Sequence, residues 1–239
     1  MRKTKFAKGN IYHIFNRGVE KRDIFLNDSD RWRFLQGLYL FNDENVSANT
    51  LWEISRNEGM AKFPLVVNSV NHKGKRNQLV KIMADCLMPN HYHLLLEENR
   101  EGGISRFMHK LGIGYTKYFN KKYDRVGGLF QGAFKAVLVD KDLYLQYLLV
   151  YLNVVNPAEL IEPKLKERGI NINDVDKIMK FVVGYPWSTH QEYLGKRNSI
   201  IIDKGILGNI FANSSKYAEF AKDVLLTKKF NTINNFLLE

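Results

Sequence analysis

The pattern of apolar and polar positions predicts a chain that mixes strands and helices. Residues 10–20 alternate as a strand does, with Ile11, His13 and Phe15 on one face. The other elements predicted are strands at 79–87, 90–98 and 133–140, and helices at 27–42, 102–123 and 140–155. The first six elements follow the order β-α-β-β-α-β. This order indicates an α+β, ferredoxin-like fold, in which an antiparallel sheet carries helices on one face.

Helical spacing assigns a buried side to the predicted helices. In the helix at 27–42 the expected stripe is Trp32, Leu35 and Tyr39, with Asp28 or Ser29 as the N-cap. In the helix at 102–123 the expected stripe is Ile104, Met108, Leu111 and Tyr115. Asp140 is the expected N-cap of the helix at 140–155. Residues 42–62 are polar and weakly patterned, which predicts a loop with a short helix.

A tight turn and a change in the pattern of apolar and polar residues indicate how the chain is organised. Met88-Pro89-Asn90 separates two predicted strands, and because the turn is so short the strands should pair antiparallel. After residue 158 the strand pattern stops and helical signals continue, including an amphipathic helix that begins near residue 214. We therefore expect a domain over residues 1–158 and a mostly helical extension over 159–239 that packs on it.

Charge and cysteine content narrow the classes of function. The 36 Lys and Arg residues against 25 Asp and Glu residues give a net charge of +11, which favours a polyanionic partner. The single cysteine, Cys86, excludes an internal disulfide framework and a cysteine-based zinc finger. No apolar run approaches the roughly 18–20 residues of a membrane span, and the basic start lacks the apolar stretch of a secretory signal. A cytoplasmic location without membrane association is expected.

His91 and His93 form the most suggestive local pattern. Residues i and i+2 of a strand point to the same face, so the two imidazoles lie together and can share one cation. Two histidines with separate hydrogen bonds are the plainer interpretation. The pair occurs in several kinds of metal site, so by itself it selects no chemistry.

Four motifs in the surrounding sequence give the pair a context: FNRGVEKRDIF, MPNHYHLLL, YFNKKYDRVGGLFQGAFKAVLVDKDLYLQYLLVYLNVVNP and YPWSTHQEYLG. Together and in this order, they resemble the REP-associated tyrosine transposases, which belong to the single-tyrosine HUH transposases of insertion sequences. The resemblance runs from about residue 10 to 195. It implies a ferredoxin-like fold, in agreement with the predicted order of elements.

The resemblance also implies a chemistry, a metal-assisted strand transfer on single-stranded DNA that folds into hairpins. His91 and His93 match the histidines that hold a divalent ion, Mg²⁺ or Mn²⁺. Tyr151 matches the nucleophile, and Tyr144 and Tyr147 share its helix face as alternatives. A phenol with a pKa near 10 is a weak nucleophile at neutral pH, and a metal on the phosphate offsets the charge that repels attack. Attack would leave a 5′-phosphotyrosine and a free 3′-hydroxyl.

The third metal ligand departs from the family pattern. The family has Asn or Gln four residues after the nucleophile, where this chain has Val155. The segment YLNVVNP is one residue longer than the family's YIxLNP. A local bulge would return Asn156 to the metal; Asn153 or Gln131 are the alternatives.

Basic and polar residues near these motifs are expected to contact DNA phosphates, although for each a solvated surface charge is the plainer interpretation. They are Arg17, Lys21, Arg22, Lys117, Arg125, Gln131 and Lys135. Phe130 is expected either to stack on an unpaired base or to lie in the core.

Two other functions stay open at this stage. A protein with the same fold could bind hairpin DNA without cutting it, if the altered spacing after Tyr151 has removed the metal site. A metal-dependent hydrolase could use the two histidines and a water nucleophile. The resemblance is compatible with a monomer and with a homodimer.

Overall fold

The computed structural model describes residues 4–50, 76–168 and 174–227. In chain order the described elements are β1 (Ile11–Arg17), the 3₁₀ turn η1 (Val19–Lys21), α1 (Asp28–Phe41), β2 (Val80–Met88), β3 (His91–Glu98), α4 (Gly103–Lys122), β4 (Lys135–Val139), α5 (Asp142–Val150), the π-helical turn η2 (Tyr151–Val155), α6 (Asn156–Ala158), α7 (Leu165–Arg168), α8 (Val175–Gly184), α9 (His190–Tyr193), α10 (Gly205–Ile210) and α11 (Ser214–Thr227). Most of the loop predicted at 42–62, and the chain up to residue 75, lie outside the described residues.

The four strands form one antiparallel sheet in the order β2-β3-β1-β4. This order is that of a ferredoxin-like sheet, so the predicted fold class is confirmed. The turn at Pro89 and Asn90 joins β2 to β3, as expected from its length. In the β2–β3 ladder Cys86 lies opposite His93, and in the β1–β3 ladder Phe15 lies opposite His93. These residues therefore share one face of the sheet.

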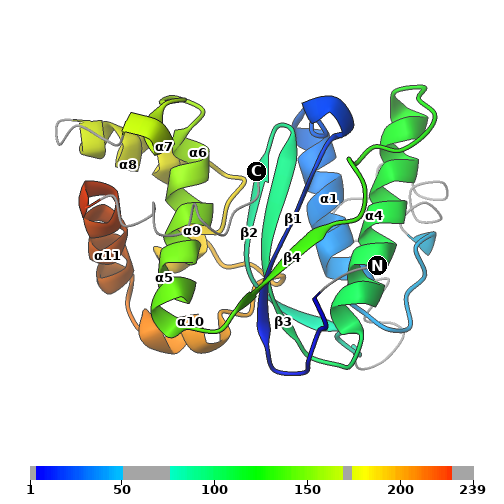
Figure 1. Cartoon of the computed structure of the whole chain (residues 1–239), viewed down its shortest axis with the longest axis horizontal. Coiled ribbons are helices and arrows are strands. Elements are labelled where there is room, and N and C mark those ends of the chain that lie inside the picture. The colour runs from blue at the N-terminus through cyan, green and yellow to red at the C-terminus, as the bar shows by residue number, and fades with distance from the viewer. Residues whose placement is uncertain (1–3, 51–75, 169–173, 228–239) are drawn as a thin grey trace.

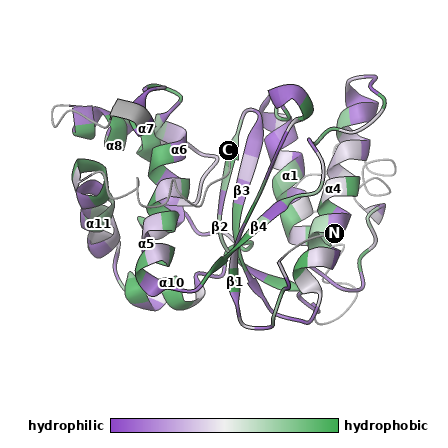
Figure 2. Cartoon of the chain, viewed as in Figure 1, coloured by the Kyte–Doolittle hydropathy of each residue, from purple (hydrophilic) through white to green (hydrophobic). Residues whose placement is uncertain are grey.

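Both faces of the sheet are covered (Figure 1). Helices α1 and α4 cover one face, where the rings of Phe34 and Tyr92 lie 4.9 Å apart. Helix α5 and the C-terminal helices lie on the other side of the sheet. Strand β1 is buried on both faces for this reason, with Ile14 under α1 and α4 and His13 on the opposite face. Figure 2 shows hydrophobic and hydrophilic residues mixed along the long helices, as expected for elements with one buried side.

Helix α4 buries the stripe that its spacing predicted. In α1 the expected stripe is confirmed at Tyr39, which is buried, and wrong at Trp32. Phe34, Leu38 and Phe41 are buried, whereas the Trp32 side chain is 51% exposed and lies edge-on to Trp187. Several helical phases fit this aromatic-rich segment, and the sheet selects the one that buries Phe34. The expected N-caps are also wrong, because Asn27 precedes α1 and Lys141 precedes α5.

The helix that carries Tyr151 departs from α geometry. After α5 the chain forms the π-helical turn η2, in which the Asn156 N–H donates to the Tyr151 carbonyl, five residues back instead of four. A π-turn absorbs one extra residue in a helix. The segment that is one residue longer than the family pattern therefore continues as a helix into α6.

The described part of the C-terminal extension covers the outer edge of β2. Leu87 donates its N–H to the Trp187 carbonyl at 2.8 Å, and Thr189 donates to the Asp85 carbonyl at 3.1 Å. Tyr193 adds a side-chain bond from its hydroxyl to the Met83 carbonyl. The YPWSTHQEYLG motif thus pairs with an edge strand that would otherwise expose its backbone groups. The domain boundary at residue 158 stays a prediction. None of the described helices has the length and apolar character of a membrane span.

Candidate active site

His91 and His93 lie on β3 in the interior of the sheet and point to the face that η2 covers. Their rings are 5.0 Å apart, centre to centre, and meet edge-on. His93 is buried and His91 is partly exposed. The predicted juxtaposition on one face is therefore present.

Each ring is held through its Nδ1 atom. His91 Nδ1 lies 2.6 Å from Asn90 Oδ1, an acceptor, so this nitrogen carries the proton. His93 Nδ1 lies 2.9 Å from Nε2 of His13, a buried residue of β1. Burial, followed by the nearby His91, His13 and Lys166, lowers the pKa of His93 well below its ordinary value. His93 is therefore neutral, which is the state that binds a metal.

His13 is the site residue that sequence reasoning missed. The strand pattern assigned His13 to the face of Phe15, but which of the other three strands would lie next to β1 and offer a partner depends on the sheet order. Once β1 pairs with β3, His13 is a diagonal neighbour of His93, and their rings stack at 5.0 Å.

Among the three tyrosines of the helix, Tyr151 is the one that meets the histidines. Its ring lies 6.1 Å from the His93 ring and perpendicular to it. Tyr147 instead stacks on Phe220 of α11 at 5.6 Å. Tyr144 is half-buried at the start of α5, where burial, and then Asp140, raise its pKa. Tyr151 therefore lies at the histidines, whereas Tyr144 and Tyr147 contribute to the packing of α5.

The two asparagines after Tyr151 are both buried but differ in their hydrogen bonds. Asn153 uses both ends of its amide: Nδ2 donates to Tyr217 Oη at 3.1 Å, and Oδ1 accepts from Thr189 Oγ1 at 2.8 Å. Neither amide atom of Asn156 has a hydrogen-bond partner among the described residues. The amide of Asn153 is therefore occupied by hydrogen bonds within the fold, whereas the amide of Asn156 is not.

A lysine and a glutamate from beyond residue 158 lie beside Tyr151. Lys166 Nζ lies 4.7 Å from the centre of the Tyr151 ring and forms a 3.0 Å ion pair with Glu159. Tyr151 itself is completely buried. The phenol is therefore covered by residues of the extension, with a cation over its ring.

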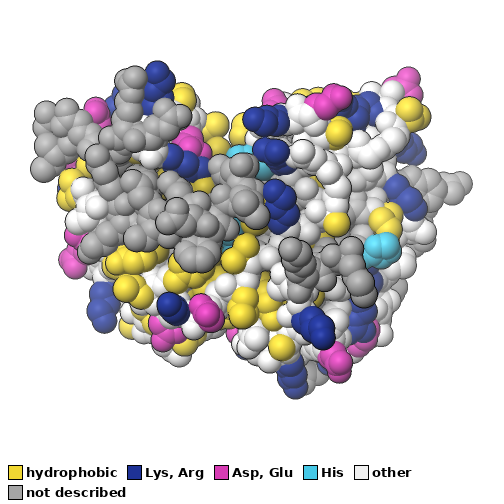
Figure 3. Space-filling view, in the orientation of Figure 1, with side chains coloured by type: hydrophobic (Ala, Val, Ile, Leu, Met, Phe, Trp, Pro, Cys, Tyr) yellow, Lys and Arg dark blue, Asp and Glu magenta, His cyan; other side chains and the backbone are white. Residues whose placement is uncertain are grey.

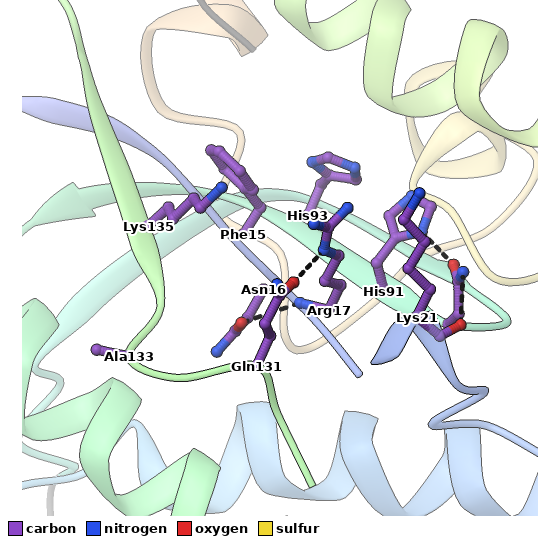
Figure 4. Close-up of a pocket in the computed structure, with 10 residues that line it drawn as sticks. Phe15, Asn16, Arg17, Lys21, His91, His93, Gln131, Ala133 and Lys135 are labelled. Atoms are coloured by element: carbon purple, nitrogen blue, oxygen red, sulfur yellow. Dashed lines mark hydrogen bonds between the residues drawn. The ribbon is translucent and has the colours of Figure 1, made fainter. Parts of the chain in front are cut away.

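A cavity of about 460 Å³ opens beside the histidines (Figure 4). Its wall comes from β1, η1, the β2–β3 turn, β3, the segment before β4 and the start of β4. The wall residues are Phe15, Asn16, Arg17, Lys21, Asn90, His91, His93, Gln131, Ala133 and Lys135. Arg17 Nε donates to Gln131 Oε1 across it. Figure 3 shows Lys and Arg side chains gathered next to histidine atoms near the middle of one face. The cavity therefore combines the two histidines with positive charge.

The remaining predicted DNA-binding residues lie elsewhere. Arg22 pairs with Glu20, and Arg125 donates to Asn120 at the end of α4. Lys117 lines a second groove of about 550 Å³ along α4, which adjoins the cavity at Asn16 and Ala133. Phe130 borders the same groove and packs against Tyr92, in agreement with the core alternative.

The glycine-rich loop before β4 is fixed to the end of β1, which sets the position of Gln131. Gln131 donates its N–H to the Arg17 carbonyl at 2.9 Å, and Asn16 Nδ2 donates to the Gly132 carbonyl. Gly132 has a φ of +140°, a backbone conformation that residues other than glycine rarely adopt. The loop can therefore bend back over the cavity only with glycine at this position.

The donor set suits a divalent cation with mixed nitrogen and oxygen ligands. Within the described ranges, no three His, Cys, Asp or Glu side chains form a metal cluster. Asn156 follows Tyr151 by one π-turn, and its amide is buried without a partner among the described residues. Such an amide costs about 1–3 kcal/mol unless a ligand satisfies it. The orphaned amide is the observation that makes the residues fit a metal.

The chain was compared with known protein families and structures. Residues 60–154 match the family model described as "Transposase IS200 like". The matched span contains both histidines, the glycine-rich loop and Tyr151. The match agrees with the family resemblance that the sequence motifs indicated.

One solved structure is similar at low identity. It is described as the "Structure of the REP associates tyrosine transposase bound to a REP hairpin". The alignment has 13% identity and a TM-score of 0.43, and covers 85% of this chain and 93% of the other. No curated protein matches the chain.

Proposed function

We propose that this protein is a transposase of the REP-associated type, which binds hairpin-forming single-stranded DNA and cleaves and rejoins it through a 5′-phosphotyrosine. The contact between the Tyr151 ring and the His93 ring carries the proposal. It joins the residue proposed as nucleophile to the histidine pair within one chain. A single copy then contains both halves of the site, which favours a monomer as the working unit.

His91, His93 and Asn156 would hold the metal, Mg²⁺ or Mn²⁺. When bound, the metal would supply positive charge to the scissile phosphate and orient it. The hydrogen bonds of the two Nδ1 atoms support this assignment, because a proton on Nδ1 leaves the lone pair on Nε2. His13 would then act as the acceptor that orients His93.

The chain's own residues would carry out the transfer. The Tyr151 Oη atom attacks the phosphorus and loses its proton; the bond from phosphorus to O3′ breaks, and O3′ leaves as a hydroxyl with a proton. Attack by a 3′-hydroxyl on the phosphotyrosine reverses the step and rejoins the strand. The covalent bond keeps the phosphodiester energy, so no nucleotide cofactor is needed.

The cavity residues would bind the DNA backbone next to the reacting phosphate. Arg17, Lys21 and Lys135 bring positive charge to the wall that contains His91 and His93, and Gln131 adds a neutral donor. Arg22, Lys117 and Arg125 are less well supported as contacts, because they lie outside this wall. The DNA strand would approach from the open side of the cavity.

Tyr151 must become accessible before it can react. In the described structure its ring lies under Lys166 and outside the cavity wall. Displacement of Lys166 and its partner Glu159 on DNA binding would uncover the phenol, and the ammonium group would then be close to the phosphate charge. This burial is also the observation that favours the second candidate, a protein that binds hairpin DNA without cutting it.

Trapping of a covalent adduct distinguishes the candidates. The protein and its Tyr151→Phe and Tyr147→Phe variants are incubated in Mn²⁺ with a library of hairpin oligonucleotides with randomised flanks, labelled at the 5′ or the 3′ end. A denaturing protein gel then reports label that stays on the protein. Label from the 3′-labelled strand, on the unaltered protein and on Tyr147→Phe but not on Tyr151→Phe, is the expected result.

Each rival predicts a different gel. Bound but uncut DNA with every protein supports the binding-only candidate. Cleavage without an adduct, unaffected by Tyr151→Phe, supports a hydrolase that uses water. An adduct that persists in Tyr151→Phe and disappears in Tyr147→Phe moves the nucleophile to Tyr147.

A further inference from the structure

The π-turn η2 is anchored by a buried chain of hydrogen bonds from the C-terminal extension. Thr189 Oγ1 donates to Asn153 Oδ1 at 2.8 Å, and Asn153 Nδ2 donates to Tyr217 Oη at 3.1 Å. Tyr217 Oη lies 2.9 Å from His190 Nδ1. All four side chains are buried. Asn153 is the member of the chain that belongs to the bulge.

The chain of bonds has one consistent direction. Burial lowers the pKa of His190 to about 4, so the ring is neutral at pH 7 and one of its nitrogens accepts. Tyr217 receives the Asn153 amide proton and can give its own to His190 Nδ1. Asn153 then accepts from Thr189 at its oxygen and donates to Tyr217 from its nitrogen, which fixes the orientation of the Asn153 amide.

The same segment is tied to the strand next to His93. Thr189 donates its N–H to the Asp85 carbonyl, and Ser188 forms a bridge with Cys86. Cys86 also lies opposite His93 of β3, which pairs with β2 on the side away from Ser188. A continuous path of hydrogen bonds therefore runs from the strand pair that holds His93, through Thr189, to Asn153 of the bulge.

A bulge of this kind needs an anchor. A helix with one residue too many can place the excess residue at several positions, and each position turns a different side chain toward the sheet. The position observed here joins Tyr151 and Asn156 by one backbone hydrogen bond. Asn153 lies between them, and its amide bonds fix which residues form the wide turn.

We propose that Thr189, His190 and Tyr217 are positioning residues that hold Asn153, and through the π-turn set the register of Tyr151 and Asn156 against His93. The extension is then part of the active site without touching the substrate. This inference rests on the proposed function, since it assigns the register to the metal ligand Asn156 and the nucleophile Tyr151.

Metal affinity tests the inference without reference to cleavage. Mn²⁺ binding to the full-length protein is measured by calorimetry and by electron paramagnetic resonance. Tyr217→Phe removes the hydroxyl that links Asn153 to His190, and it should weaken Mn²⁺ binding about 10- to 100-fold, the range for residues that orient ligands. Tyr193→Phe is the matched control, because its buried hydroxyl also ties the extension to β2 but does not contact Asn153. It should change the affinity less than twofold.

A bulge-free background separates positioning from general destabilisation. Deletion of Val155 shortens the segment to YLNVNP, in which a regular α-helix brings the asparagine four residues after Tyr151. The ordinary helical hydrogen bonds then set the register, so Tyr217→Phe should have less than a twofold effect on Mn²⁺ affinity in this background.

The outcomes are distinct. An unchanged affinity in Tyr217→Phe, or a loss equal to that in Tyr193→Phe, overturns the positioning role. An equal loss with and without Val155 overturns it too, because the effect would not depend on the bulge. Absence of Mn²⁺ binding by the unaltered protein overturns the proposed metal site, and the inference with it. If the deletion variant does not fold, the comparison of Tyr217→Phe with Tyr193→Phe decides.

Discussion

His91 and His93 lie on a strand in the interior of the sheet, whereas Tyr151 and Asn156 lie on a helix whose backbone departs from α geometry. The strand half is held by neighbouring strands and by short bonds from Asn90 and His13. The helical half is held by residues 36 to 64 positions away, in the extension.

The strand half and the helical half of the site should differ in their tolerance of an inserted residue. On a strand the two-residue period sets both rings on one face, and an insertion would move one of them to the other face. In a helix an extra residue can be absorbed by a π-turn, provided that other contacts select its position. The longer segment after Tyr151 is therefore compatible with a complete site.

Removal of a histidine of the strand half should have the largest effect. His93→Ala takes away a proposed metal ligand, so cleavage should fall roughly 10³-fold or more. His13→Ala leaves the ligand but removes its acceptor, so Mn²⁺ affinity should fall about 10- to 100-fold. Cleavage rates over a range of Mn²⁺ concentrations separate the two, because excess Mn²⁺ should restore His13→Ala and not His93→Ala. Equal behaviour of the two variants would contradict the assigned roles.

The two asparagines of the helical half should respond in opposite ways. Asn153→Leu leaves Thr189 and Tyr217 without their partner and should lower the free energy of unfolding by about 1–3 kcal/mol. Asn156→Leu removes a buried amide that lacks a partner in the described structure, so stability should hold or rise while Mn²⁺ binding is lost. Urea unfolding curves and calorimetry measure both quantities. A large loss of stability in Asn156→Leu would show that its amide serves the fold.

The basic residues of the cavity should contribute more to DNA binding than those outside it. Lys135→Gln should reduce the slope of log affinity against log salt by about 1, as expected for one lost phosphate contact. Arg125→Gln, which changes the same charge away from the cavity, should leave the slope nearly unchanged. Fluorescence anisotropy with a hairpin oligonucleotide between 50 and 300 mM salt, roughly the range in which such slopes are measured, provides the test. Equal slopes for both variants would mean a diffuse electrostatic effect.

The smallest expected effect is on the pH dependence of stability. His190 has a pKa of about 4 in the folded chain and near 6.5 when unfolded. The unfolded chain therefore binds the proton first as the pH falls, and stability from this group, complete above pH 6.5, is lost toward pH 4. His190→Asn can still accept from Tyr217 but does not titrate in this range. Its melting temperature should fall less steeply between pH 7 and pH 5 than that of the unaltered protein. Parallel curves would indicate that His190 is not buried as a neutral ring.

Local patterns predicted much of the fold and the strand half of the site. The stripe on α4 and the order of elements needed only residue spacing, since each strand or helix has one period. The stripe on α1 was wrong at Trp32 because Trp32 and Phe34 both fit an aromatic helix, and only the sheet decides which of the two is buried. The sequence also led us to expect a bulge after Tyr151, but not the residues that hold it.

The histidine pair, the tyrosine helix and the positive charge could be recognised from the amino-acid sequence, and the excess residue from the family resemblance. These depend on type and spacing, which act over a few residues. Three features became visible only in the folded chain. His13 contacts His93, and Tyr151 rather than Tyr147 lies against His93. The amide of Asn153 is hydrogen-bonded within the fold, whereas that of Asn156 is not. Each of these depends on contacts between residues far apart in the chain. The pairing of strands and the docking of the extension on β2 create those contacts, and no local period encodes them.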